Sequence, residues 1–366
     1  MKDYKLSEGS SLILDLIRGL SAQIVVVGHG ITFFGIFTFL QEPKFPNIHY
    51  IAVLIFFLLS GFLISYSTVR KKTFDENYGF KHYFIDRFSR IYTSFIPAII
   101  FVFLIDFVSK SINPALYLEN SNFDFKTFIG NIFMFQDYSI FSLIPYKLVH
   151  CFGTAKPFWT LAIEWWIYLS FGYLLLVILR KKKISLLNIL VFSFFSIVPI
   201  FNLIMGRGNG LTTYWLFGSL VYLISSLNLL NEVSKNIKLI FILFFSGLGF
   251  LRAYLKMEAY DPIFAFFLAI TLWLVIDYFK DQKFSIISMK FIKYNASFSY
   301  TLYLIHYSIL SFIKTHFDGT MSPYLLLLIG FIISNIVSIL IGRYIELSLT
   351  KKVQHFLYDK IEVKST

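Results

Sequence analysis

The sequence predicts an all-α polytopic membrane protein with about ten transmembrane helices and both termini in the cytoplasm. Of its 366 residues, 57% are hydrophobic and only 15% are charged, whereas soluble domains carry about 25% charged residues. Apolar runs of about 20 residues, long enough to cross a bilayer, recur along the chain. Basic clusters separate these runs in a regular order. We therefore expect one transmembrane domain, residues 1–366, embedded in a lipid bilayer.

The apolar segments and the basic clusters alternate along the chain. The segments are 11–35, 48–69, 91–109, 158–179, 184–205, 211–229, 237–255, 261–279, 296–316 and 323–345. Basic clusters follow every second segment, at 70–72, 180–183, 231–238, 280–283 and 351–352. Because cytoplasmic loops are enriched in Lys and Arg, an even number of spans with cytoplasmic termini satisfies this order. The N-terminus shows no small-residue cleavage site, so we expect the first helix to be retained.

One connection, residues 110–157, is long and lies outside the cell by this count. It contains "FKTFIGNIFMFQ", which is too short to span and is expected to be interfacial or re-entrant. The single cysteine, Cys151, excludes an internal disulfide and a multi-thiolate metal site, and no metal is expected. The net charge of +12 is spread over short clusters, so we expect no nucleic-acid partner.

Two ionisable residues stand out in the first apolar segment, "LIRGLSAQIVVVGHG". Arg18 and His29 are eleven residues apart, close to three helical turns, so they share one face about 16 Å apart. Ionisable side chains inside a bilayer are costly and usually functional. We expect both to line one groove, with Arg18 nearer the cytoplasm. The alternative is a snorkelling arginine paired with Asp15 at i,i+3, plus a core histidine.

A carboxylate lies at a similar depth in "PFWTLAIEWWIYLSFGYLL". Glu164 is about two turns, or about 10 Å, inside a helix that enters from the outer side. A carboxylate and an imidazole at one depth suit an acid–base pair, so Glu164 is predicted to act with His29. The alternative is a structural pairing of Glu164 with a lysine or a backbone group. Trp159, Trp165 and Trp166 are predicted to form an interfacial belt.

Further candidates lie in later segments. His306, near the middle of "SFSYTLYLIHYSIL", is either catalytic or a buried hydrogen-bonding group. Arg87 and Arg90 are spaced i,i+3 in "IDRFSRIYTSF", and paired guanidinium groups suit phosphate recognition. Their alternative role is anchoring at the cytoplasmic surface. Glu346, in "RYIELS", closes the last helix on the same side.

Small residues in the second segment favour packing over chemistry. Ser60 and Gly61 in "FFLLSGFLIS" let helices approach closely, whereas a nucleophilic Ser60 would need an adjacent base that the sequence does not show. The order of these residues along the chain leads us to expect phosphate-type ligands at the inner face and a histidine towards the outer face. A long phosphorylated donor could span that offset and present its reactive end to an acceptor.

These residues resemble the integral-membrane acyltransferase 3 family. "RGLSAQIVVVGH" fits its first-helix motif of Arg, ten residues and His, and the preceding "LD" is also present. "FFLLSGFLIS" is similar to its FFxLSGFLI signature, and "DRFSR" to its Arg-x-x-Arg element. "FWTLAIEWWIYL" resembles its WSLxxE block, "SYTLYLIH" its SYxLYLxH block, and "YIE" its terminal acidic element. The six motifs occur in the expected order over essentially the whole chain.

The resemblance implies a multi-pass enzyme of the bacterial inner membrane. Such an enzyme transfers an acyl group, usually acetyl and sometimes succinyl, from cytoplasmic acyl-CoA to a sugar hydroxyl. The acceptor would be O-antigen, capsule, exopolysaccharide or a lipid-linked oligosaccharide. Carried over by motif, the candidate catalytic residues are His29, Glu164 and His306, the donor-binding residues Arg18, Arg87 and Arg90, and the supporting residues Asp15, Ser60, Trp159 and Glu346.

The chain departs from the family pattern at three sites. The proline expected after the Arg-x-x-Arg element is absent, with Pro97 further on; Ser308 replaces a proline, and Thr160 replaces a serine.

Two other classes of protein compete with this interpretation. A transporter or flippase would also place ionisable groups around a midplane cavity, but would not depend on acyl-CoA. A polysaccharide polymerase would need large outer loops, and only 110–157 qualifies.

Overall fold

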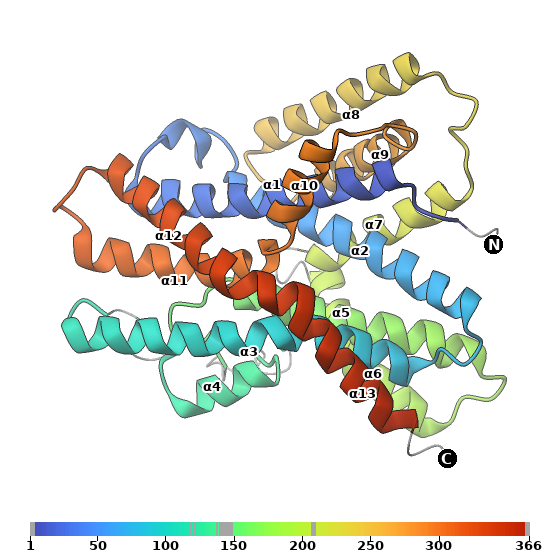
Figure 1. The fold of residues 1–366 in the computed structure, drawn as a ribbon, viewed down its shortest axis with the longest axis horizontal. Coiled ribbons are helices and arrows are strands. Elements are labelled where there is room, and N and C mark those ends of the chain that lie inside the picture. The colour runs from blue at the N-terminus through green and yellow to red at the C-terminus, as the bar shows by residue number, and fades with distance from the viewer. Residues whose placement is uncertain are drawn as a thin grey trace. The chain divides into compact units, whose positions relative to one another are not determined.

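The structure, a computed structural model, describes residues 4–117, 119, 122–136, 138, 149–205 and 210–362. Every regular element in these ranges is a helix (Figure 1). Seven helical stretches are long and apolar enough to cross a membrane. They are α1 (Glu8–Phe34), α2 (Ile48–Phe74), α3 (Phe80–Ile112), α5 (Phe158–Leu176) with the turn after it, α6 (Leu186–Met205), α8 (Lys235–Lys256), and the stretch that starts with α12 (Pro323–Tyr344).

Three further helices fall on the remaining apolar segments. They are α7 (Leu211–Ser226), α9 (Pro262–Tyr278) and α11 (Ser299–Phe317). The first two are 16 and 17 residues long, shorter than the roughly 20 residues that a straight span needs. The all-helical membrane architecture is therefore confirmed, while the count of ten spans and the cytoplasmic termini stay predictions.

Three helices lie outside the apolar segments. The eight-residue α4 (Phe125–Ile132) falls within the long connection 110–157, and the Asp124 side chain caps it by accepting from Thr127 N. A helix of eight residues rises only about 12 Å, which agrees with a segment too short to span. The other two are α10 (Ile286–Ala296) and α13 (Thr350–Glu362), and no apolar segment predicts them.

The contacts of the chain form two compact units whose segments interleave. The first unit contains the described residues of Met1–Gly28, Phe37–Glu76 and Asn209–Ser299. The second contains those of His29–Ile36, Asn77–Gly208 and Tyr300–Thr366. Since the unit boundary falls inside α1, Arg18 belongs to the first unit and His29 to the second.

The first unit is built on a close approach of α2 and α7. A Cβ atom on Gly61 would overlap the carbonyl oxygen of Trp215, and one on Gly218 would overlap that of Leu58. Ser65 donates to Ser219 at 2.8 Å across the same contact. Small residues let helix backbones meet and let hydroxyls bond between them. Around this contact lies a core of Leu14, Leu58, Leu59, Phe62, Val221, Tyr222, Ala269, Leu272 and Ile276.

The second unit is built around α5, which packs on α3 and α6. The ring of Tyr83 lies directly against Gly172, and its hydroxyl donates to Tyr168 O at 3.0 Å. The predicted interfacial belt is wrong for Trp165 and Trp166, which are only 5% and 4% exposed. Both indoles pack against aromatic rings, and Trp166 Nε1 donates to the Met134 carbonyl at 2.8 Å. Buried indoles need such an acceptor, and a surface belt does not supply one.

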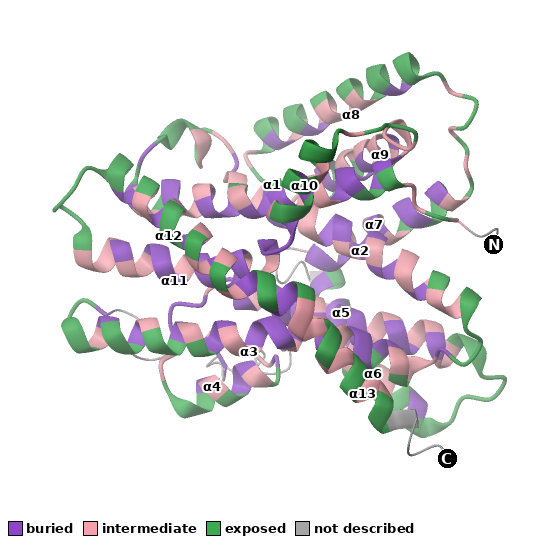
Figure 2. Ribbon diagram, viewed as in Figure 1, coloured by how far each residue is buried: buried purple, intermediate pink, exposed green. Residues whose placement is uncertain are grey.

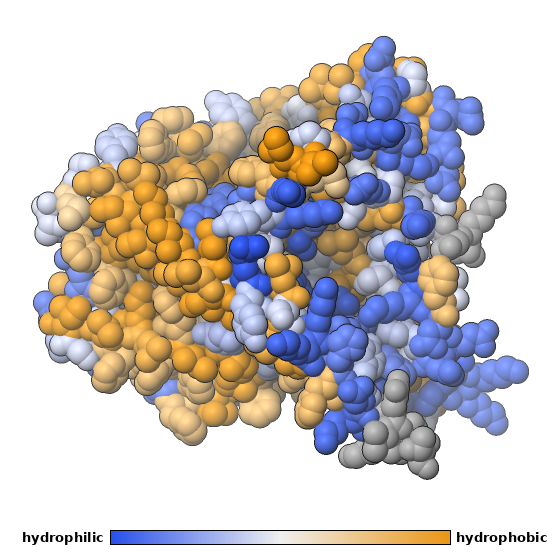
Figure 3. All heavy atoms as spheres, viewed as in Figure 1, coloured by the Kyte–Doolittle hydropathy of each residue, from blue (hydrophilic) through white to orange (hydrophobic). Residues whose placement is uncertain are grey.

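Helix exposure agrees with a bilayer environment in each unit. Figure 2 shows that most of α8 is exposed, and only Lys238, Gly249 and Ala253 of this helix are buried. In the second unit, hydrophobic atoms cover the visible face of α12, whereas hydrophilic atoms are frequent along α13 (Figure 3). An exposed helix of apolar side chains is stable where hydrocarbon replaces water.

The α2–α7 approach gives a stability prediction. We expect Gly61→Ala to destabilise the protein by about 1–3 kcal/mol, since the added methyl overlaps backbone that cannot move aside. Thermal unfolding in detergent micelles measures the change. Gly247→Ala on α8 is the matched control, because a Cβ there meets nothing within 4 Å. Equal melting temperatures for the two variants would contradict the close approach.

Candidate active site

The second unit brings two candidate histidines together. His29 lies near the end of α1 and His306 in the middle of α11, and His306 Nε2 is 3.0 Å from His29 Nδ1. The two rings are 5.1 Å apart between centroids. His306 is completely buried. Residues 277 positions apart in the sequence therefore form one hydrogen-bonded pair.

The bonding pattern determines which nitrogens carry protons. His306 Nδ1 lies 3.0 Å from the carbonyl oxygen of Leu302, which can only accept, so Nδ1 is protonated. In a neutral His306, Nε2 is then an acceptor, and His29 Nδ1 must donate to it. A neutral His29 consequently has its unprotonated nitrogen at Nε2. The pair thus assigns the basic atom of His29 to Nε2.

Packing at the end of α1 holds the His29 ring. The ring of Tyr307 meets His29 edge-on at 5.1 Å and Phe33 at 4.8 Å. Gly30 fits against Leu327 of α12, where a Cβ would overlap the leucine side chain. Edge-to-face aromatic contacts and tight packing restrict ring rotation. The orientation of His29 is therefore set by α11 and α12 as well as by its own helix.

Glu164 lies on a face of α5 that approaches α11. Thr160, one turn before Glu164, contacts the Tyr303 hydroxyl at 2.5 Å, and residues spaced i,i+4 share a helix face. The Glu164 carboxylate accepts from Tyr168 at 2.5 Å. The departure at Thr160 therefore keeps a hydroxyl where the family has serine. The pairing of Glu164 with His29 stays a prediction.

Glu346 joins the end of α12 to the start of α11. It lies in a π-helix, Ile345–Leu349, and is 8% exposed. Its carboxylate accepts from the backbone N–H of Thr301 at 2.8 Å and from the Thr301 hydroxyl at 3.0 Å. First-turn N–H groups lack partners within their own helix, so Glu346 caps α11. The same carboxylate pairs with Arg90 at 3.4 Å.

Arg87 and Arg90 lie on α3 but have different environments. Arg90 is held by Glu346 and stacks over the Tyr300 ring at 5.3 Å. Arg87 lies over the Tyr83 ring at 5.7 Å, and its buried Nε has no hydrogen-bond partner among the described residues. Of the two, Arg87 is therefore the guanidinium with a buried N–H that no described residue accepts.

A second carboxylate, Asp86, ties α13 to α3 beside these arginines. It accepts from Tyr78 and Tyr358, both at 2.7 Å, and from Gln354 at 2.5 Å. Burial, followed by the charge of Asp86, raises the pKa of Tyr78 well above its usual value, so this hydroxyl stays protonated and donates. The C-terminal helix is thus fastened next to the arginine pair.

The candidates in the first unit have described partners as well. Arg18 Nη2 is 2.8 Å from Asp15 Oδ1, which confirms the i,i+3 pair. Ser60 Oγ accepts from the Trp215 indole at 3.1 Å, on the helix pair where Gly61 makes its close contact. This bond supports packing as the role of Ser60. The groove that Arg18 and His29 are predicted to share stays a prediction.

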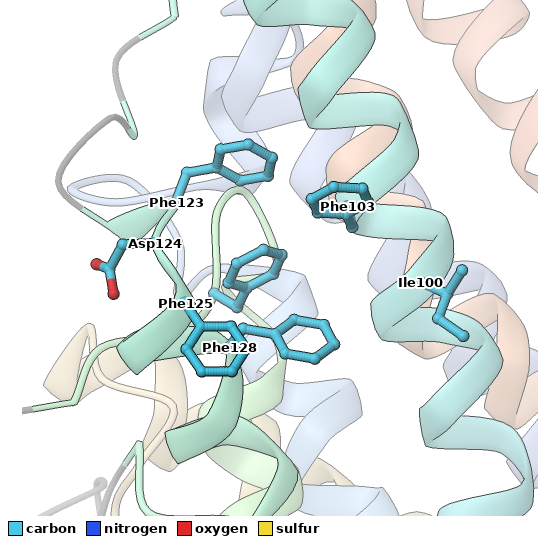
Figure 4. Close-up of a pocket in the computed structure, with 7 residues that line it drawn as sticks. Ile100, Phe103, Phe123, Asp124, Phe125 and Phe128 are labelled. Carbon is cyan, nitrogen blue, oxygen red and sulfur yellow. The ribbon is translucent and has the colours of Figure 1, made fainter.

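An apolar pocket lies apart from these candidates. It has a volume of about 320 Å³ and is lined by Ile100, Phe103, Phe123, Asp124, Phe125, Phe128 and Phe152 (Figure 4). Because Asp124 caps α4, the lining offers hydrocarbon rather than hydrogen-bonding groups. In the described part of the chain, no three His, Cys, Asp or Glu side chains form a group that could hold a metal ion.

Comparison with known proteins identifies the class and the family. A family model described as an acyltransferase domain matches residues 12–343. The chain is therefore a membrane protein of an acyltransferase class. The chain belongs to the acyltransferase 3 family. Comparison with curated proteins and with solved structures gives no match.

Several site residues had no sequence signal. Tyr303 and Tyr307 flank His306 on α11 and contact the other elements of the site, yet tyrosines are common in this chain, with 23 in all. The Leu302 carbonyl, which orients His306, is a backbone group of an ordinary residue. Only the helical spacing of four between Leu302 and His306 indicates it, once His306 is known to be buried.

The Glu346 contacts predict a loss of stability. We expect Glu346→Gln to destabilise the protein by about 1–3 kcal/mol, because the Arg90 ion pair is lost and the bond to the Thr301 N–H is weakened. Thermal unfolding in detergent measures this change. Glu232→Gln, at an exposed position, is the control that changes the same charge, and we expect its melting temperature to equal that of the parent. A Glu346→Gln melting temperature unchanged from the parent would show that the cap is dispensable.

Proposed function

We propose that this protein is an O-acyltransferase of the bacterial plasma membrane. It moves an acyl group, in the first instance acetyl, from cytoplasmic acyl-CoA to a hydroxyl of a cell-surface glycan or its lipid-linked precursor. The observation that carries the proposal is the His306–His29 hydrogen bond, because it gives His29 a defined basic nitrogen. Membership of the acyltransferase 3 family supports the reaction class.

In the proposed mechanism His29 is the general base. His29 Nε2 takes the proton of the acceptor hydroxyl as its oxygen attacks the thioester carbonyl. The C–S bond then breaks, and the CoA sulfur leaves with the proton that His29 returns. While His29 is cationic, its Nδ1–H bond to His306 Nε2 becomes charge-assisted and stronger. His306 is thus a positioning residue that also stabilises the charge, and Glu164 adds a negative charge on the neighbouring helix.

The arginines are proposed to hold the donor. Arg87 offers its buried Nε to a phosphate oxygen, whereas Arg90 is fixed by Glu346 and supplies charge. Guanidinium groups bind phosphate in defined geometry. Arg18, paired with Asp15, is proposed to contact the donor further along α1. Asp15, Trp159 and Glu346 support these groups.

Substitution of His29 tests the mechanism. We expect His29→Ala to lower acyl transfer at least 100-fold, the usual contribution of a general base, without loss of the protein from the membrane. Transfer of labelled acetyl from acetyl-CoA, supplied to inside-out vesicles, measures the rate. A variant that transfers acetyl at the parental rate would exclude His29 as the base. Export of glycan with no use of acetyl-CoA would favour the transporter alternative instead.

Substitutions of His306 distinguish a role in setting the tautomer of His29 from a role in packing alone. We expect His306→Phe, which keeps a ring but removes the acceptor nitrogen, to lower kcat at least 10-fold with little change in KM for acetyl-CoA. His306→Gln restores an acceptor to the site and should recover part of the rate. If His306→Phe and the parent share the same kcat, the hydrogen bond has no part in the chemistry.

Proton NMR of surface glycan, with and without the protein, identifies the acceptor by loss of an O-acetyl methyl signal.

A further inference from the structure

A buried carboxylate in α3 binds the long connection at two places. Asp106 is 2% exposed. Its Oδ2 accepts from Thr154 N at 2.8 Å and from the Tyr117 hydroxyl at 3.1 Å, and its Oδ1 accepts from the Thr154 hydroxyl at 2.7 Å. A carboxylate in an apolar interior is stable only with such donors around it. Both ends of the connection therefore converge on one side chain.

The backbone beside Asp106 is shaped for this approach. Gly153 has φ of +51°, a conformation that favours glycine. A Cβ at this position would overlap Asp106 Oδ2, so only glycine lets the chain come so near. Gly153 N also donates to Asn122 O at 3.0 Å, which ties the two ends of the connection to each other.

Other described residues of the connection contact α5 and α3. Gln136 donates to the Phe158 carbonyl at 2.9 Å, at the first residue of α5. In Figure 4 the rings of Phe123 and Phe103 lie close together, and Phe152 completes the same pocket. Residues 149–157 are thus held between Asp106 and the beginning of the helix that carries Thr160 and Glu164.

We propose that Asp106 is a positioning residue that fixes residues 149–157 as a wall of the acceptor path. It acts through Thr154 and the start of α5 and does not touch the reacting atoms. The wall would select the acceptor and leave donor binding unchanged. This acceptor role rests on the proposed acyl transfer, whereas the fixing of the connection does not.

The single cysteine provides a built-in probe of the wall. Cys151 is half-buried, two residues before Gly153, and its thiol donates to the Lys156 carbonyl at 3.4 Å. We expect Asp106→Asn to speed the reaction of Cys151 with N-ethylmaleimide about tenfold, because local opening becomes easier. Tyr117→Phe, which removes one donor, should give a smaller increase and serves if Asp106→Asn fails to fold. Asp318→Asn, at an exposed ion pair with Lys314, should react like the parent.

Kinetics test the acceptor role separately. In Tyr117→Phe and Asp106→Asn we expect KM for the acceptor to rise at least about threefold while KM for acetyl-CoA stays constant, a split that general loss of stability would not produce. If Cys151 is labelled at the same rate in the parent and in both variants, Asp106 does not fix this segment. This conclusion holds whether or not the protein transfers acyl groups. If Cys151 is labelled faster but the KM values for acceptor and for acetyl-CoA are both unchanged, or both rise, the segment does not select the acceptor.

Discussion

The structure depends on one constraint: a polar side chain buried among membrane helices must find its partner within the protein. His306 illustrates this constraint most directly. It is completely buried, and it meets its two needs with the Leu302 carbonyl and with His29. Since the carbonyl can only accept, the direction of every proton in the pair follows from it. The asymmetry that makes His29 Nε2 basic thus originates in a backbone group of α11.

The same constraint explains how the ends of the helices are held. Glu346 caps α11 and pairs with Arg90, and Asp86 gathers hydroxyls from two segments beside Arg87. In the second unit, α11 takes part in both groups: it carries His306, and Tyr300 near its start stacks against Arg90. Site geometry and helix stability are coupled by shared side chains.

Local patterns in the sequence predicted the helices well and the pairings poorly. Each apolar segment contains a helix, since hydrophobicity and length act within one segment. The Asp15–Arg18 pair, which is the alternative considered for Arg18, is also visible locally because both residues lie on one turn. The His29–His306 bond joins residues 277 apart, and no local pattern encodes it. The interfacial belt is wrong for Trp165 and Trp166 because tryptophan as a residue type favours a membrane interface, whereas the packing of α5 buries both side chains. The helices α10 and α13 contain no apolar run long enough to span a bilayer, so hydropathy gives no sign of them.

Bonding distinguishes anchors from reactive groups better than residue type does. Asp86, Asp106 and Glu346 are all buried carboxylates, and each accepts at least three hydrogen bonds from described residues. Each of these carboxylates joins separate segments of the fold, which suits it to a structural role. His29 differs, because it donates from Nδ1 and keeps its basic nitrogen at Nε2. A base must gain and lose a proton in every cycle without unfastening its helix. By that criterion, His29 is better suited to the chemistry than any of these three buried carboxylates.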